Sequence, residues 1–239
     1  MWKFRHFSIF GSVMEKLSAV VITYNEEKNI ERCIRSLEGV ADEIVVLDSF
    51  STDHTKEICE KYKVRFFTRK FDGYIEQKNS AISHAGYPHV LSLDADEALS
   101  GTLKASILQV KSNWDADGYT FNRLTNYCGK WIRHCGWYPD RKLRLFDARK
   151  GRWAGLNPHD VFVMKDNTVV RHLKGDLLHY SYYTIEEHHR QAEHFSTISA
   201  KAKFEQGKKA PLIKVLASPV VKFLKCYLIQ LGFLEGSSG

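Results

Sequence analysis

The sequence predicts an α/β fold with a mostly parallel central sheet flanked by helices, and three observations support this prediction. Between Leu17 and Asp94, short apolar runs alternate with helical patterns, which is the signature of βαβ units. Two of these runs end in an aspartate, at Asp48 and Asp94, where α/β sheets bind ligands. After residue 112, strands with alternating polar and apolar residues replace this pattern, and a helical segment follows from residue 184.

The first half of the chain is expected to hold four strands joined by three helices. Each strand is a short run rich in Val, Ile, Leu or Phe. The expected strands are 17–23, 43–48, 64–67 and 89–94. The expected helices are 30–37, which Gly39 ends, 55–62, which follows the capping residues 51–55, and 73–84.

The second half is expected to hold further strands and then a helical C-terminus. Strands are predicted at 118–124, 144–146 and 161–164. A capping-box sequence at 184–187 opens a helix that runs to about Gly207. Residues 211–231 are mostly apolar and are interrupted by lysines, so this segment either lies in a membrane interface as a cationic amphipathic helix or packs on the domain.

Composition narrows the class of protein. The 239-residue chain has a formal net charge of +7, which indicates an anionic partner such as a nucleotide, a phospholipid surface or nucleic acid. Lys201 to Lys225 contains seven lysines and one acid, Glu205. No apolar stretch is long enough to form a spanning helix. Five irregularly spaced cysteines without a Cys-x-x-Cys pair favour reduced thiols and a cytoplasmic location.

The predicted organisation has four parts. Residues 1–14 are interpreted as a disordered extension, because they lack the long apolar core and cleavage site of a signal peptide. Residues 15–112 form a first half of alternating strands and helices, and residues 113–183 form a second half of further strands. Residues 184–239 form a C-terminal helical segment, which is a candidate for membrane association.

The tripeptide Asp94-Ala95-Asp96 is the strongest candidate for a binding site. It follows the predicted strand 89–94, and two carboxylates there are suited to one hard cation, Mg²⁺ or Mn²⁺, shared with substrate phosphates. The alternative is that Asp96 and Glu97 only begin a helix, near the positive end of its dipole. Because the chain has neither a Gly-x-Gly-x-x-Gly nor a Walker A sequence, a bridging metal is the favoured way to hold phosphates.

Several ordered motifs resemble the family 2 glycosyltransferases, which have the GT-A fold and use nucleotide-sugar donors. The matching segments are residues 20–27, 46–53, 77–81 and 93–97. Residues 137–146, Trp153, His159 and Asp160 resemble the subgroup of bacterial lipopolysaccharide-core β-glucosyltransferases. The resemblance covers roughly residues 15–235. It implies that residues 15–112 are the nucleotide-sugar-binding half and that residues 113–183 are the acceptor-binding and catalytic half.

This resemblance implies a role for each matching residue. The donor, a nucleotide-diphosphate sugar with UDP-hexose favoured, would be bound by residues of four segments: Thr23, Tyr24, Asn25, Glu26, Asp48, Ser51, Lys78, Asp94, Ala95 and Asp96. The metal would be held by Asp94 and Asp96, with His179 completing its ligands. Asp140 is the first candidate for the base that deprotonates the acceptor hydroxyl in an inverting reaction, and Asp160 is the second.

The acceptor implied by the resemblance is a glycan or a lipid-linked sugar of the cell envelope. The aromatic and basic segment around Trp137 suits such an acceptor, and the C-terminal lysines suit an anionic leaflet at the inner face of the cell membrane. Two other functions compete with this interpretation. A sugar-phosphate nucleotidyltransferase normally carries a Gly-rich loop after its first strand, where this chain has residues 23–26. A nucleic-acid-binding protein would leave the acid-tipped strands unexplained, so no nucleic-acid partner is expected.

Overall fold

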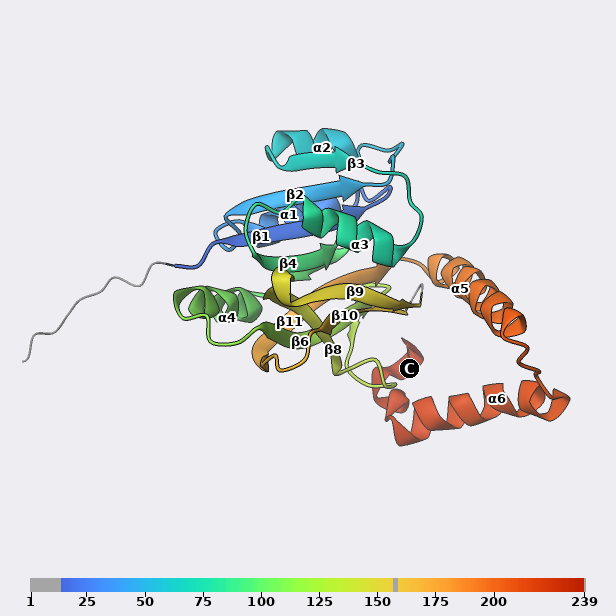
Figure 1. The fold of residues 1–239 in the computed structure, drawn as a ribbon. Coiled ribbons are helices and arrows are strands. Elements are labelled where there is room, and N and C mark those ends of the chain that lie inside the picture. The colour runs from blue at the N-terminus through green and yellow to red at the C-terminus, as the bar shows by residue number, and fades with distance from the viewer. Residues whose placement is uncertain (1–13, 157–158, 239) are drawn as a thin grey trace, which may run out of the picture.

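A nine-stranded mixed sheet forms the centre of the computed structural model, which describes residues 14–156 and 159–238 (Figure 1). Its strands follow the order β3-β2-β1-β4-β8-β6-β11-β5, and β7 pairs with β6. The strands are β1 (Leu17–Thr23), β2 (Glu43–Asp48), β3 (Arg65–Thr68), β4 (His89–Asp94), β5 (Glu97–Leu99), β6 (Gly118–Tyr127), β7 (Lys130–Ile132), β8 (Asp140–Asp147) and β11 (Val170–Tyr182). A separate hairpin contains β9 (Gly151–Leu156) and β10 (His159–Met164).

Helices and the hairpin cover the two faces of this sheet. One core cluster joins the strands to α1 (Ile30–Leu37), α2 (Thr55–Lys61) and α4 (Gly101–Ser112). A second cluster on the other face joins them to α3 (Tyr74–Ser83) and to Trp153 and Phe162 of the hairpin. Successive strand residues serve opposite clusters, as Val20 and Val21 of β1 do, because side chains alternate across a strand. The predicted α/β fold, with a central sheet flanked by helices, is confirmed. The sheet is mixed, however: pairing is parallel from β3 to β4 and between β6 and β11, and it is antiparallel elsewhere.

The four strands of the first half are parallel, and their carboxyl ends lie at one edge of the sheet. β1 pairs in parallel with β2 and β4, and β2 pairs in parallel with β3. β1, β2 and β4 match their predicted ranges, while β3 is shifted by one residue. This register places Thr23 beside Asp48 and Ile22 beside Asp94, so the loops after these strands meet at the same edge.

Strand β8 joins the two predicted halves into one sheet. It runs antiparallel between β4 and β6, with Leu91 opposite Leu145 and Arg123 opposite Asp140. Because β8 is antiparallel to β4, its first residue, Asp140, lies toward the edge where β4 ends. β11 runs parallel to β6 and places His179 beside Thr125. The catalytic residues predicted from both halves are thereby brought toward one edge.

One alternative for the acidic motif is wrong. Asp96 and Glu97 do not begin a helix, because Glu97–Leu99 is the short strand β5, which pairs with β11. The following helix α4 begins at Gly101 and is capped by Ser100, whose Oγ accepts a hydrogen bond from the Leu103 N–H at 3.2 Å. The sequence interpretation omitted β5, β7, β9, α4 and the long strand β11.

The C-terminal region is helical, as predicted, and leaves the body of the protein (Figure 1). α5 (Ile185–Glu205) is followed by α6 (Leu212–Leu224), a π-helical turn (Lys225–Ile229) and a 3₁₀ segment (Gly232–Ser238). None of the α6 residues is buried. The alternative that the segment 211–231 packs on the domain is therefore wrong for α6, although Gln230 near its end bonds to Cys135 of the body. No helix in residues 14–156 and 159–238 is both long and apolar enough to cross a membrane. Of the predicted extension 1–14, residues 1–13 lie outside the described residues.

Candidate active site

The loops after β1 and β2 are fastened together by reciprocal hydrogen bonds. The buried Asp48 carboxylate accepts the Ser51 backbone N–H at 2.8 Å, and Ser51 Oγ in turn accepts the Asn25 N–H at 2.8 Å. Asn25 adopts a left-handed φ of 54°, and its Oδ1 accepts the Thr52 N–H at 2.8 Å. These contacts bring together four of the predicted nucleotide-binding positions, 23, 25, 48 and 51, in one cradle.

Two polar groups of this cradle remain available for a ligand. Thr23 is buried, yet its Oγ1 has no hydrogen-bonding partner in the described part of the chain. Tyr24 is 58% exposed at the top of the cradle. A buried hydroxyl without a partner is costly unless something else satisfies it, so the cradle has the character of a binding site.

Asp94, at the tip of β4, is held between two cations. Its Oδ2 lies 2.9 Å from Arg144 Nη2, and its Oδ1 lies 3.1 Å from Lys78 Nζ. Burial raises the pKa of Asp94, but the charges of Lys78 and Arg144 outweigh burial and hold that pKa well below its usual value. Oδ1 is buried and has the Lys78 ammonium as its ion-pair partner. Asp94 is therefore an ionised carboxylate whose two oxygens each face a cation.

Lys78 is shared between two carboxylates, those of Asp94 and Asp160. Its side chain is 4% exposed, and its Nζ lies 2.8 Å from Asp160 Oδ2 as well as 3.1 Å from Asp94. The ring of Trp153 lies 4.6 Å from the same nitrogen. Asp160, the second predicted base, is thus placed as the ion-pair partner of Lys78, and it does not line the cavity that contains Asp140.

Asp96 pairs with His179 across the end of the sheet. Asp96 Oδ2 lies 3.1 Å from His179 Nε2, while Thr125 Oγ1 lies 3.3 Å from His179 Nδ1. Burial lowers the pKa of His179, but the Asp96 carboxylate outweighs burial, so the pKa is raised overall. Ala95, between the two aspartates, is buried, and its N–H bonds to the Ile22 carbonyl at 3.1 Å. This bond ties the Asp-x-Asp turn to β1.

These residues form a donor set that fits a divalent cation. The structure describes no group of three His, Cys, Asp or Glu side chains already arranged to hold a metal ion among residues 14–156 and 159–238. However, the Asp96 carboxylate and the His179 ring already meet at 3.1 Å, and the ionised Asp94 carboxylate stands at the tip of β4, two residues before Asp96. Two carboxylates and one imidazole suit Mn²⁺ well and Mg²⁺ less well.

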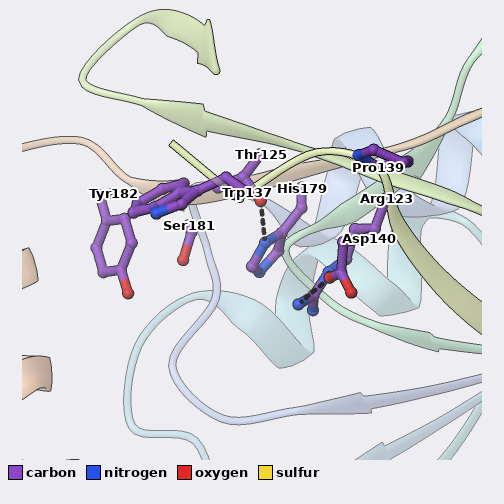
Figure 2. A pocket seen from close by; sticks show the side chains of 9 residues that line it. Arg123, Thr125, Trp137, Pro139, Asp140, His179, Ser181 and Tyr182 are labelled. Carbon is purple, nitrogen blue, oxygen red and sulfur yellow. Dashed lines mark hydrogen bonds and ion pairs between the residues drawn. The ribbon is translucent and has the colours of Figure 1, made fainter. Parts of the chain in front are cut away.

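A cavity of about 280 Å³ lies next to this pair (Figure 2). Asp140 and His179 both line it, so the first predicted base and the predicted metal ligand share one space. The other lining residues come mainly from β6, β11 and the segment before β8: Arg123, Thr125, Gly136, Trp137, Pro139, Ser181 and Tyr182. An aromatic side chain at one end and a carboxylate at the other suit a sugar ring that presents a hydroxyl.

Asp140 is fixed by two cations at the cavity wall. Its Oδ2 lies 3.0 Å from Arg123 Nε and 2.9 Å from Nη2, and its Oδ1 lies 3.0 Å from Lys142 Nζ. Figure 2 shows the Arg123 and Asp140 side chains pointing toward one another. The fork of Arg123 sets the orientation of the carboxylate, whereas the more exposed Lys142, at 36%, contacts its other oxygen.

Three charged residues of the site were not predicted from the sequence. Glu97 is fully buried, and its Oε1 lies 3.2 Å from Arg144 Nη2 and 3.6 Å from Arg123 Nη1. Through Glu97, Arg144 and Arg123 therefore connect Asp94 at the tip of β4 to Asp140 at the start of β8. The only sequence signal for Glu97 was its place after Asp96, and Arg123 lay within an alternating strand that gave no functional signal.

Glu26 gives the site a pH dependence of stability. Burial raises the pKa of this carboxyl to about 7, with the nearby charge of Asp96 adding to it. The unfolded chain ionises this group near pH 4.5. Between pH 4.5 and 7 the native state therefore binds more protons than the unfolded state, and stability falls as pH rises through that window. We expect the free energy of unfolding to drop by roughly 2–4 kcal/mol because of this group.

Urea denaturation between pH 4 and 8, without added metal, tests this expectation. Glu26→Gln should flatten the decline seen in the parent protein. Glu38→Gln, at an exposed glutamate that ends α1, serves as a control for loss of one carboxylate elsewhere. Equal slopes for the parent and Glu26→Gln would show that Glu26 does not titrate in this window.

A family model and several known proteins match more than half of this chain. The family model described as Glycosyl transferase family 2 matches residues 18–171. The chain is 30% identical over 241 residues to the lipopolysaccharide core biosynthesis glycosyltransferase LpsC of Rhizobium meliloti, covering 93% of this chain and 87% of the relative. It is also 30% identical over 236 residues to an uncharacterized glycosyltransferase of Rickettsia typhi, covering 95% and 81%.

Similar solved structures include TarS of S. aureus in complex with UDP, at 23% identity and a TM-score of 0.40. That match covers 56% of this chain and 47% of TarS. Glucosyl-3-phosphoglycerate synthase of Mycobacterium tuberculosis, solved with Mn²⁺ and UDP, matches at 21% identity and a TM-score of 0.39. It covers 53% of this chain and 51% of the synthase.

Proposed function

Because the chain belongs to glycosyl transferase family 2, we propose that it transfers a hexose from a nucleotide-diphosphate sugar to a glycan or lipid-linked acceptor. The observation that carries this proposal is that Asp140 and His179 line one cavity, while His179 also pairs with Asp96 of the Asp-x-Asp turn. Donor chemistry and acceptor chemistry thereby lie side by side at the carboxyl edge of the sheet. Family membership also favours a transferase over the sugar-phosphate nucleotidyltransferase alternative.

The donor side of the proposal uses the cradle and the Asp-x-Asp turn. Thr23 to Glu26, Asp48 and Ser51 bind the nucleoside, with UDP as the favoured nucleotide. Asp94, Asp96 and His179 are the residues that would hold a Mn²⁺ or Mg²⁺ ion. When bound, this ion offsets the negative charge that develops on the departing diphosphate. Lys78 keeps Asp94 ionised and in place, and Asp160 fixes Lys78 from the other side.

The acceptor side uses Asp140 as the base. The acceptor hydroxyl attacks the anomeric carbon, the bond from that carbon to the diphosphate oxygen breaks, and the hydroxyl proton passes to Asp140. Attack on the face opposite the leaving group inverts the anomeric centre. Trp137 and Tyr182 at the cavity wall are placed to stack on an acceptor sugar. Asp160 is not our choice of base, because its carboxylate pairs with Lys78 and does not line the cavity that contains Asp140.

We also propose that this transfer builds a lipopolysaccharide core or another cell-envelope glycan from the cytoplasmic side, at the inner face of the cell membrane. The relative LpsC, whose name assigns it to lipopolysaccharide core biosynthesis, supports the pathway class. The exposed apolar and basic helix α6 supports an anionic membrane surface as partner.

A thermal-shift measurement tests the donor proposal. UDP-glucose with Mn²⁺ is expected to raise the melting temperature more than either alone. A ligand that binds only the native state adds about 2.7 kcal/mol of stability when its concentration is 100 times its Kd. Asp96→Asn should abolish the increment due to Mn²⁺ and keep part of the nucleotide effect. Repeating the measurement with GDP- and ADP-sugars shows which nucleotide raises the melting temperature most.

The matched control is Asp166→Asn, which removes an exposed aspartate from the turn between β10 and β11. It should respond to UDP-glucose and Mn²⁺ as the parent does. If no nucleotide sugar shifts the melting temperature of the parent protein, with or without Mn²⁺, the proposed function is wrong. A nucleotide shift that is equal in Asp96→Asn and the parent would instead refute the metal assignment alone.

A further inference from the structure

The C-terminal arm, residues 206–235, presents an apolar helix without a protein partner in the described structure. All of α6 is exposed, including Leu212 at 73% and Ile213 at 78%. Lys214, Ser218, Lys222 and Lys225 recur at spacings of three or four, so they lie along one stripe of the helix. The remaining faces are almost wholly apolar. An exposed apolar surface of this kind marks an interaction site.

The charges of the arm identify an anionic bilayer as its partner. Residues 206–234 contain five lysines and no aspartate or glutamate. A second copy of the arm would place lysine against lysine, whereas anionic headgroups attract each lysine near the surface by about 1 kcal/mol. A helix with a wide apolar face and a narrow cationic stripe lies in the plane of the interface. The helix is also too short to cross a membrane.

The arm returns to the catalytic body and is held there by Glu235. This side chain is 5% exposed, and its Oε1 accepts hydrogen bonds from the backbone N–H groups of Arg133 at 2.8 Å and His134 at 3.0 Å. His134 Nδ1 lies 2.7 Å from the same oxygen, and Lys130 Nζ lies 3.1 Å from Oε2. Burial raises the pKa of Glu235, but these donors outweigh burial and hold it at about 2.

The segment that Glu235 holds also forms the acceptor cavity. We call residues 130–139 the acceptor loop, because Gly136, Trp137 and Pro139 line the cavity beside Asp140. A second hydrogen bond joins the two segments: the Cys135 N–H of the acceptor loop donates to the Gln230 carbonyl of the arm at 2.9 Å. Cys135 directly precedes the cavity-lining Gly136. The arm therefore contacts the acceptor loop directly before the residues that shape the cavity.

We propose that Glu235 is a positioning residue that ties the acceptor loop to an arm bound on an anionic bilayer, so that the cavity receives an acceptor anchored in that bilayer. This inference rests on the proposed function, since it takes the cavity as the acceptor site. Binding of the arm to lipid restrains residues 206–234, and Glu235 passes that restraint to the loop. The acceptor class is a sugar on a lipid whose headgroup lies at the membrane surface.

Vesicle sedimentation and hydrogen exchange test the proposal on the full chain. Vesicles of phosphatidylcholine with phosphatidylglycerol should sediment the parent protein and Glu235→Gln equally, and vesicles of phosphatidylcholine alone should sediment neither well. The amides of residues 133–135 should exchange roughly tenfold faster in Glu235→Gln than in the parent. Anionic vesicles should slow exchange in the acceptor loop of the parent but not in Glu235→Gln.

Further variants separate lipid binding by the arm from the role of Glu235, and they guard against misfolding. Lys214→Glu with Lys222→Glu should lower the vesicle-bound fraction at least roughly tenfold and leave exchange of residues 133–135 unchanged in solution. Lys61→Glu with Lys70→Glu reverses the same charge outside the arm and should still sediment. Glu235→Asp keeps the carboxylate and should restore part of the vesicle effect, and Lys130→Met, which removes one partner of Glu235, should weaken it.

Each outcome decides a separate point. Failure of the parent to sediment with anionic vesicles would overturn the bilayer partner. An equal vesicle effect on the loop in the parent and Glu235→Gln would overturn the role of Glu235. The thermal shift with UDP-glucose and Mn²⁺ should be the same for Glu235→Gln and the parent. Loss of that shift in both would count against the proposed function and not against the arm.

Discussion

Replacing Asp140 with asparagine is expected to lower the rate of hexose transfer by about 10²–10⁴-fold, which is the usual contribution of a general base. The side chain keeps its size and one acceptor oxygen for Arg123, but it no longer takes a proton from the acceptor hydroxyl. Donor binding should stay near the parent value, because Asp140 does not touch the cradle residues. Transfer of labelled hexose from UDP-hexose to a membrane glycolipid extract measures the rate, and the thermal shift with UDP measures donor binding.

Asp160→Asn provides the discriminating comparison. Because Asp160 lies 2.8 Å from Lys78, its replacement should weaken the hold on Lys78 and thereby donor binding, with a smaller loss of kcat than Asp140→Asn. If Asp140→Asn keeps more than about a tenth of parent activity while Asp160→Asn abolishes it, the two assignments must be exchanged. If both variants lose UDP binding together, neither is the base and the site is disrupted as a whole.

The proposed donor and acceptor sites are connected by a continuous series of ion pairs with alternating sign. The series runs through Asp160, Lys78, Asp94, Arg144, Glu97, Arg123 and Asp140. Each interior member is held on two sides, so its position depends on its neighbours. This arrangement explains how residues from the first and second halves of the chain keep one geometry. It also means that substitutions within the series will not be additive.

The donor half could be predicted from the sequence because its signals are local. The apolar run 17–23 and the run 43–48 each contain their own evidence of a strand, and parallel pairing then brings Asp48 and Asp94 to one edge. The Asp-x-Asp motif added the prediction of a metal site. The order of neighbouring residues was enough for the strands, whereas the role of each residue toward a donor came from the family resemblance.

The acceptor half depended on pairing between distant residues, which periodicity does not show. Strand β11 contains Lys174, Gly175 and Asp176, and a bulge between His172 and Asp176 interrupts its alternation. It is a strand because β6 and β5 pair with it. Asp160 was assigned to the acceptor by resemblance, while its contact with Lys78 joins positions 82 residues apart.

Arg144→Met is expected to reduce the free energy of unfolding by about 3–5 kcal/mol, which is the usual cost of removing one member of a buried ion pair. Its side chain is 4% exposed and lies 2.9 Å from Asp94 and 3.2 Å from Glu97. Methionine fills similar volume but leaves the fully buried Glu97 with the Asp94 N–H at 3.0 Å and, at the longer distance of 3.6 Å, the charge of Arg123. Chemical denaturation of the parent and the variant at pH 7 measures the loss.

Two further variants show whether uncompensated charge is the cause. Arg149→Met breaks an ion pair with Asp147 in which the arginine is 68% exposed, and it should cost less than about 1 kcal/mol. Adding Glu97→Gln to Arg144→Met removes the stranded charge, so the double variant should be more stable than Arg144→Met alone. A double variant that is less stable than Arg144→Met by the full cost of Glu97→Gln alone would show that the two residues do not interact. In that case the series of ion pairs between donor and acceptor would be broken at its centre.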